Sequence, residues 1–98
     1  MAMGKITLLD MVASYTGQPV AILCSGNWYR GILREVGTDY VVLEPARAVA
    51  DPGPLNADRP KVEYPIPSSV IVGTSAIALL CQPAWAWFEM PVVRPPRR

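Results

Sequence analysis

The chain has 98 residues, which is enough for one small domain. Apolar residues make up 51% of it and charged residues only 17%, so we expect another molecule to cover part of its surface. It contains no histidine and only two cysteines, which excludes the commonest general base and the usual histidine or cysteine metal sites. We therefore expect a non-catalytic protein without metal or cofactor.

Charge is distributed unevenly along the chain. Residues 1–93 carry six Lys and Arg against eight Asp and Glu, a balance of −2, and the last five residues add three arginines. The body is therefore not a basic nucleic-acid surface, whereas the C-terminal tail has the charge to attract phosphate.

The apolar segments do not have the pattern of a signal peptide or a membrane span. The first apolar run is short and is interrupted by Asp10. The later run, 68–82, has fifteen residues between prolines, fewer than the about twenty that a spanning helix needs. We predict a cytoplasmic protein that is not in a membrane and that keeps Cys24 and Cys81 as reduced, buried thiols.

The first half of the chain predicts a helix followed by three strands. Apolar residues recur at helical spacing over 7–16, and Gly17 then provides a helix stop. Apolar runs separated by glycine-containing turns predict strands over 19–24, 27–36 and 39–45. Gly31 lies inside the second of these strands and predicts a sharp bend or a close approach of another backbone.

The second half predicts two more strands. Five of the eleven prolines lie within residues 46–68, which we interpret as a long loop. Strands are predicted over 69–73 and 76–82, and an aromatic segment that covers an apolar face or a neighbouring subunit begins the tail, 83–98. Residues 1–98 are thus predicted to form one domain, a small, strongly bent, five-stranded antiparallel β-barrel with an N-terminal helix.

This order of elements resembles the Sm and Sm-like (Hfq-like) family. The stretch "LLDMVASYTGQPVAILCSGNWYRGILREVGTDYVVLEPA" is similar to the first Sm motif, and "VIVGTSAIALL" is similar to the second. The long middle loop and the aromatic tail are closest in character to phage-type Sm-like proteins. The resemblance implies an Sm-like barrel in a homo-oligomeric ring of about five to seven copies, with five or six favoured.

The resemblance also implies a subunit interface. In the family, the fourth strand of one subunit pairs with the fifth strand of the next, so that no sheet edge stays open. The interface residues implied for this chain are Val70, Ile71, Val72, Ile77 and Leu79.

RNA is the ligand that the family implies. The residues of the two matching turns and of the basic tail are Tyr40, Asp39, Thr74, Ser75, Arg94, Arg97 and Arg98. These turns lack the asparagine and the arginine with which family members hold uridine, and Tyr40 also fits the pattern of a packed strand aromatic. The alternative to RNA binding is therefore a structural or assembly ring, such as a phage component, that lacks the RNA pocket.

Overall fold

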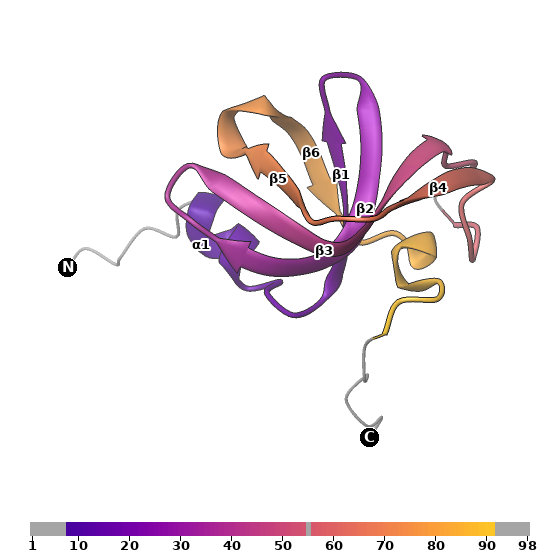
Figure 1. Cartoon of the computed structure of the whole chain (residues 1–98), viewed down its shortest axis with the longest axis horizontal. Helices are drawn as coiled ribbons and strands as arrows, with labels where there is room; N and C mark the ends of the chain where they lie inside the picture. The colour runs from indigo at the N-terminus through magenta and orange to yellow at the C-terminus, as the bar shows by residue number, and fades with distance from the viewer. Residues whose placement is uncertain (1–7, 55, 92–98) are drawn as a thin grey trace.

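The computed structural model describes residues 8–54 and 56–91 and is mainly β (Figure 1). Its elements in chain order are α1 (Leu8–Ala13), β1 (Pro19–Cys24), β2 (Asn27–Val36), β3 (Tyr40–Asp51), β4 (Val62–Ile66), β5 (Val70–Gly73), the 3-10 helix η1 (Thr74–Ala76), β6 (Ile77–Cys81) and the 3-10 helix η2 (Ala84–Trp87). No helix within the described ranges is long and apolar enough to cross a lipid bilayer.

The strands form one antiparallel sheet that is bent but open. The order is β4-β3-β2-β1-β6, and β5 also pairs with β3. Strand β3 has 12 residues, and along one edge its first part pairs with β5 and its second part with β4. The described ladders do not join β6 to β5 or to β4, so hydrogen bonds within one chain do not close the predicted barrel.

The structure corrects two of the predicted ranges. Residues 46–68, predicted as a loop, contain the second part of β3 and the whole of β4. Pro65 fits within β4 because β4 is an edge strand that pairs with β3 alone. The predicted helix over 7–16 is shorter, since α1 ends at Ala13; residue 7 lies outside the described residues.

The bend in β2 lies at Gly31. The register of the β2–β3 pairing shifts directly after this residue. A Cβ atom at Gly31 would overlap the carbonyl oxygen of Pro45 and come within 3.1 Å of the Cα atom of Ala46. The predicted close backbone approach is therefore confirmed, and it lets β2 and β3 lie against each other at the bend.

Apolar side chains form two separate clusters on the two faces of the sheet. We call the larger one the core cluster; its buried members are Val12, Val20, Ile22, Leu33, Val41, Leu43, Ala46 and Val72. We call residues 84–90 the strap and the smaller cluster beneath them the strap cluster; it consists of Ala21, Val49 and Trp85, with Trp28 and Cys81 packed against them. Because successive strand residues point to opposite faces, β1 contributes to both clusters.

Candidate functional site

Strands β5 and β6 are both edge strands. In the described part of the chain, β5 pairs with β3 and β6 pairs with β1, and no ladder covers the other edge of either strand. The short helix η1 connects the two strands. The unpaired N–H and C=O groups along such edges can pair with a strand of another chain.

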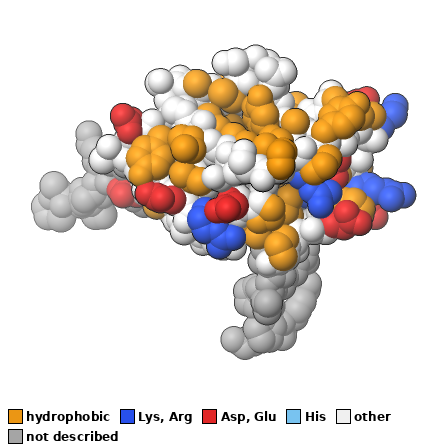
Figure 2. Space-filling model, viewed as in Figure 1, with side chains coloured by type: hydrophobic (Ala, Val, Ile, Leu, Met, Phe, Trp, Pro, Cys, Tyr) orange, Lys and Arg blue, Asp and Glu red, His pale blue; other side chains and the backbone are white. Residues whose placement is uncertain are grey.

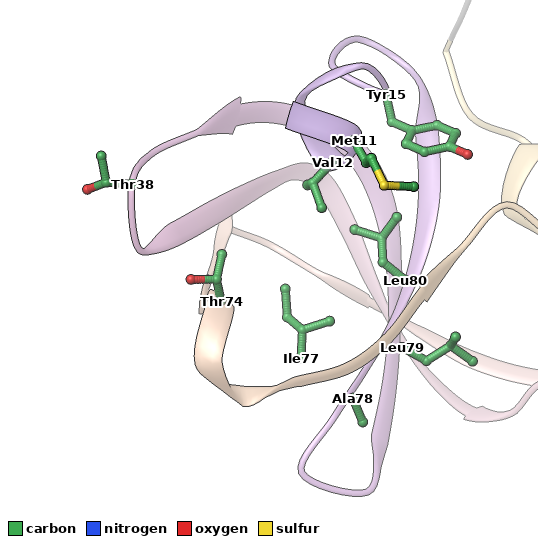
Figure 3. Close-up of a pocket in the computed structure, with 9 residues that line it drawn as sticks. All are labelled: Met11, Val12, Tyr15, Thr38, Thr74, Ile77, Ala78, Leu79 and Leu80. Atoms are coloured by element: carbon green, nitrogen blue, oxygen red, sulfur yellow. The ribbon is translucent and has the colours of Figure 1, made fainter. Parts of the chain in front are cut away.

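An apolar groove of about 510 Å³ lies beside β6 (Figure 3). Its lining residues are Met11, Val12, Tyr15, Thr38, Thr74, Ile77, Ala78, Leu79 and Leu80. Figure 3 shows Met11 and Val12 on the α1 side and Ile77 and Leu80 on the β6 side. Met11 is 56% exposed, so the groove presents apolar surface to solvent.

The five predicted interface residues divide between the two faces of the sheet. Val72 is buried in the core cluster of its own chain, and Val70 and Ile77 pack against that cluster. Ile71 and Leu79 instead are 70% and 45% exposed. Of the predicted set, these two therefore offer the largest free apolar side chains to a partner. On the side of the molecule seen in Figure 2, apolar side chains lie over β3, β5 and β4.

The two turns predicted to hold a nucleotide lie next to each other. The backbone N–H of Thr74 donates a hydrogen bond to the carbonyl oxygen of Asp39 over 3.0 Å, and Tyr40 pairs with Gly73 in the β3–β5 ladder. Ser75 in the same turn is exposed. The structure therefore brings these four predicted residues together, whereas Arg94, Arg97 and Arg98 lie outside the described residues.

The ring and the hydroxyl of Tyr40 contact residues at the end of β2 and in the turn that follows it. Its ring lies over Gly37, where a Cβ atom would overlap it, and its hydroxyl donates a 2.6 Å hydrogen bond to Oε2 of Glu35. The hydrogen bond and the negative charge of Glu35, followed by desolvation and the charge of Asp39, raise the pKa of Tyr40 above 10.0. Tyr40 thus stands in acidic surroundings, which disfavour an approaching phosphate.

A buried ion cluster on the strap side was not predicted from the sequence. Arg30 is fully buried, and its Nε and Nη2 atoms donate to the two carboxylate oxygens of Glu63 at 2.7 and 2.8 Å. Its Nη1 atom donates to three strap carbonyl oxygens, those of Trp85, Ala86 and Phe88, at 3.2, 3.3 and 2.6 Å. The signal in the sequence was Arg30 itself, a charged residue that lies between apolar residues of β2. Its partner gave no signal, because Glu63 lies 33 positions away in the stretch predicted as a loop.

The same carboxylate serves a second arginine. Arg47 donates to Glu63 over 3.1 Å and lies 3.5 Å from the carboxylate of Glu89. Desolvation raises the pKa of Glu63, but the hydrogen bonds and charges of Arg30 and Arg47 outweigh it and hold this pKa below 4.5. Glu63 is therefore ionised at neutral pH and balances the buried charge of Arg30.

The described residues contain no group of three or more His, Cys, Asp or Glu side chains that is placed to hold a metal ion. No protein-family model matches the chain, and no curated protein sequence matches it. The Sm-like resemblance therefore stays a prediction that rests on the motifs in residues 8–46 and 70–80.

Proposed function

We propose that this protein is a non-catalytic assembly protein that forms a closed ring of identical copies. The observation that carries the proposal is the pair of free edges on β5 and β6, each beside an exposed apolar side chain. Pairing β5 of one copy with β6 of the next satisfies both edges, and such a head-to-tail contact closes into a ring. The ring has about five to seven copies, with five or six favoured, as the Sm-like resemblance implies.

The faces of the two strands fit this pairing. In β5, Val70 and Val72 point toward the core cluster, so Ile71 points outward; in β6, Leu80 packs toward the same cluster and Leu79 points outward. When β5 and β6 of two copies pair in one continuous sheet, Ile71 and Leu79 meet on its outer face. Such a cross-strand apolar pair contributes about 0.2–1 kcal/mol at each interface, in addition to the backbone hydrogen bonds between the two strands.

The mass in solution tests the ring. At micromolar concentration, light scattering should give wild type a mass several times that of one chain. Ile71→Lys and Leu79→Glu should each shift this mass toward that of the monomer, because the apolar cross-strand pair is lost and a charged side chain faces an apolar one across the paired strands. Tyr64→Lys is the matched control, since Tyr64 is 59% exposed on the other edge strand, β4. A monomeric wild-type protein would contradict the proposal.

Combining the two charge changes tests the predicted contact. A chain that carries both Ile71→Lys and Leu79→Glu should regain the ring, because every interface then has a Lys opposite a Glu. Mixing equal amounts of the two single variants should give rings in which the variants alternate. Contacts between the introduced lysine and the introduced glutamate then alternate with contacts between the original Ile71 and Leu79. An alternating ring closes only with an even number of copies, so this mixture separates six from five or seven.

RNA binding by the assembled ring is the second candidate function. The observation in its favour is the approach of Tyr40 and Asp39 to Thr74 across the 3.0 Å hydrogen bond between the turns. The acidic surroundings of Tyr40, with Glu35 bound to its hydroxyl, support the structural ring instead. RNA attraction in this protein therefore relies mainly on the arginine tail.

Binding of uridine and adenosine oligomers across a salt series tests the RNA candidate. Tail-driven binding is weak, steeply salt-dependent and indifferent to sequence, and truncation after Val93 should abolish most of it. Tyr40→Ala should then weaken binding by at most about 1–3 kcal/mol. Uridine-selective binding that survives truncation and is lost with Tyr40 would indicate a pocket. No binding at low salt by full-length or truncated protein would leave the structural ring.

A further inference from the structure

We propose that the strap is a latch that Arg30 holds closed, and that it opens as a unit while the core cluster stays folded. Opening exposes a second apolar face of the sheet, formed by Ala21, Trp28, Val49 and Cys81. This inference does not depend on the proposed ring, because every contact that carries it lies within one chain.

The strap is held to the sheet through side chains. The hydrogen bonds that the structure gives for its backbone N–H groups are local, from Ala86 to Pro83, from Phe88 to Trp85 and from Met90 to Trp87, at 2.9, 3.3 and 3.2 Å. The three strap carbonyl oxygens of Trp85, Ala86 and Phe88 instead accept from Nη1 of Arg30. A segment without ladder bonds to the sheet is the kind that opens locally, below the free energy of global unfolding.

Arg30 joins the strap to β4 as well as to β2. One side of its guanidinium group binds Glu63 with two hydrogen bonds, and Nη1 binds the strap. A lysine has no planar fork and does not reproduce both sets of bonds. Arg30 lies directly opposite Arg47 in the β2–β3 register. The carboxylate of Glu63 is therefore needed to balance both positive charges. The latch is therefore centred on one buried group with several partners, and Arg47 adds an ion pair to Glu89 of the strap at 3.5 Å.

The contacts of Trp85 act in opposite directions. Its ring is fully buried and meets Trp28 edge to face, with the ring centroids 5.7 Å apart and the planes at 85°. Its buried Nε1–H group, however, has no hydrogen-bond partner in the described structure. Water would accept a hydrogen bond from that donor in the open state, so the unsatisfied Nε1–H group favours opening. Packing of the Trp85 ring and the hydrogen bonds of Arg30 favour closure.

The two cysteines provide a reporter for each cluster. Cys81 packs against the strap cluster, and Cys24 packs against the core cluster. Both are free and partly buried. Desolvation also raises the pKa of Cys81, which slows its reaction with thiol reagents in the closed state. Opening of the strap alone should therefore expose Cys81 without exposing Cys24.

Thiol labelling in two single-cysteine chains tests the latch. Cys24→Ala leaves Cys81 as the reporter, and Cys81→Ala leaves Cys24. Arg30→Lys should increase the labelling rate of Cys81 by roughly tenfold or more and change that of Cys24 by less than about twofold. Arg34→Lys is the matched control, because Arg34 is an exposed arginine on the same strand that donates to the carbonyl oxygen of Glu44. It should change neither rate.

A urea series on the two single-cysteine chains keeps the proposal testable if Arg30→Lys does not fold. Labelling of Cys81 should depend on urea less steeply than labelling of Cys24, since opening the strap exposes less surface than unfolding the sheet. The same difference is expected in the Leu79→Glu background, whether or not a ring forms. Equal urea dependences, or an Arg30→Lys variant that folds and leaves Cys81 labelling unchanged, would overturn the proposal.

Discussion

The core cluster and the strap cluster lie on opposite faces of one sheet and are closed by different means. Strands β1, β2, β3 and β5 enclose the core cluster and are joined to one another by ladders of backbone hydrogen bonds. The strap cluster is closed by a short segment that Arg30 anchors through its carbonyl oxygens. From this difference we expect the two clusters to open with different cooperativity, because only the segments around the core cluster share the backbone hydrogen bonds of the sheet.

The variant with the largest expected effect, Gly31→Val, should disrupt both clusters at once. Gly31 pairs with Val20 and with Ala46, and a Cβ atom there would overlap the carbonyl oxygen of Pro45. Gly31→Val should therefore prevent formation of the bent sheet, and soluble folded protein should be lost, as measured by expression yield and circular dichroism. A variant that melts like the parent would show that Gly31 is an ordinary strand residue.

The next effect separates the core cluster from the strap cluster. Leu43 is fully buried in the core cluster and is part of the β3–β5 ladder. Leu43→Ala should lower the free energy of unfolding by about 2–5 kcal/mol, measured from urea denaturation. Labelling of Cys24 should accelerate, because the core cluster opens only with the whole sheet, whereas labelling of Cys81 should change less, because it proceeds through opening of the strap. Equal acceleration of the two reporters would contradict this separation.

Trp85→Ala removes a larger side chain and should nevertheless destabilise the whole protein less than Leu43→Ala. A buried tryptophan truncated in an ordinary core loses about 3–5 kcal/mol. Here the loss is limited to the free energy with which the strap docks, because the strap can open while the sheet remains folded. Urea denaturation followed by far-ultraviolet circular dichroism gives the comparison. A greater loss for Trp85→Ala would mean that the two clusters unfold together.

Acid should weaken the strap side first. The pKa of Glu63 is lower in the folded chain than its ordinary value of 4.5, so its ion pairs stabilise the fold above that pH and are lost as pH falls through the folded pKa. Glu63→Gln should cost about 1.5–3 kcal/mol at neutral pH and should reduce the loss of stability on acidification. Urea midpoints between neutral pH and pH values below 4.5 measure both effects. An unchanged acid profile in Glu63→Gln would exclude this ion pair as the cause.

The smallest expected effect touches neither cluster. The hydrogen bond and charge of Glu35 raise the pKa of Tyr40, so Glu35→Gln should lower that pKa toward 10.0. The absorbance difference between the parent and Tyr40→Phe isolates this titration, and the labelling rates of Cys24 and Cys81 should not change. An unaltered Tyr40 titration would show that the 2.6 Å hydrogen bond is not maintained in solution.

The sequence predicted the first half of the sheet better than the second. The ranges of β1 and β2 coincide with the predicted ones, because apolar runs and a glycine-containing turn delimit both. Strand β4 was missed because Pro65 within it and Pro60 and Pro67 beside it are typical of loops, and only its place at the sheet edge makes Pro65 acceptable. That place depends on the length of β3, which local sequence patterns do not indicate.

The candidate sites show the same division. Ile71 and Leu79 were predicted as interface residues and are exposed on edge strands, whereas Val72, from the same predicted set, is buried in its own chain. Periodicity alone did not separate them, because both faces of β5 are apolar. The role of Arg30 was not predictable, since its burial depends on Glu63 and on strap carbonyl oxygens 55 to 58 positions away.

The placement of one carboxylate between two arginines has an evolutionary consequence. Arg30 and Arg47 face each other across the β2–β3 pair, and Glu63 binds both. A mutation that neutralises Glu63 leaves two like charges together, one of them fully buried, whereas a mutation of Arg30 leaves Glu63 with its surface partner. During evolution, Arg30 should therefore be replaced before Glu63 or together with it. Homologous sequences should retain Glu63 wherever Arg30 is retained.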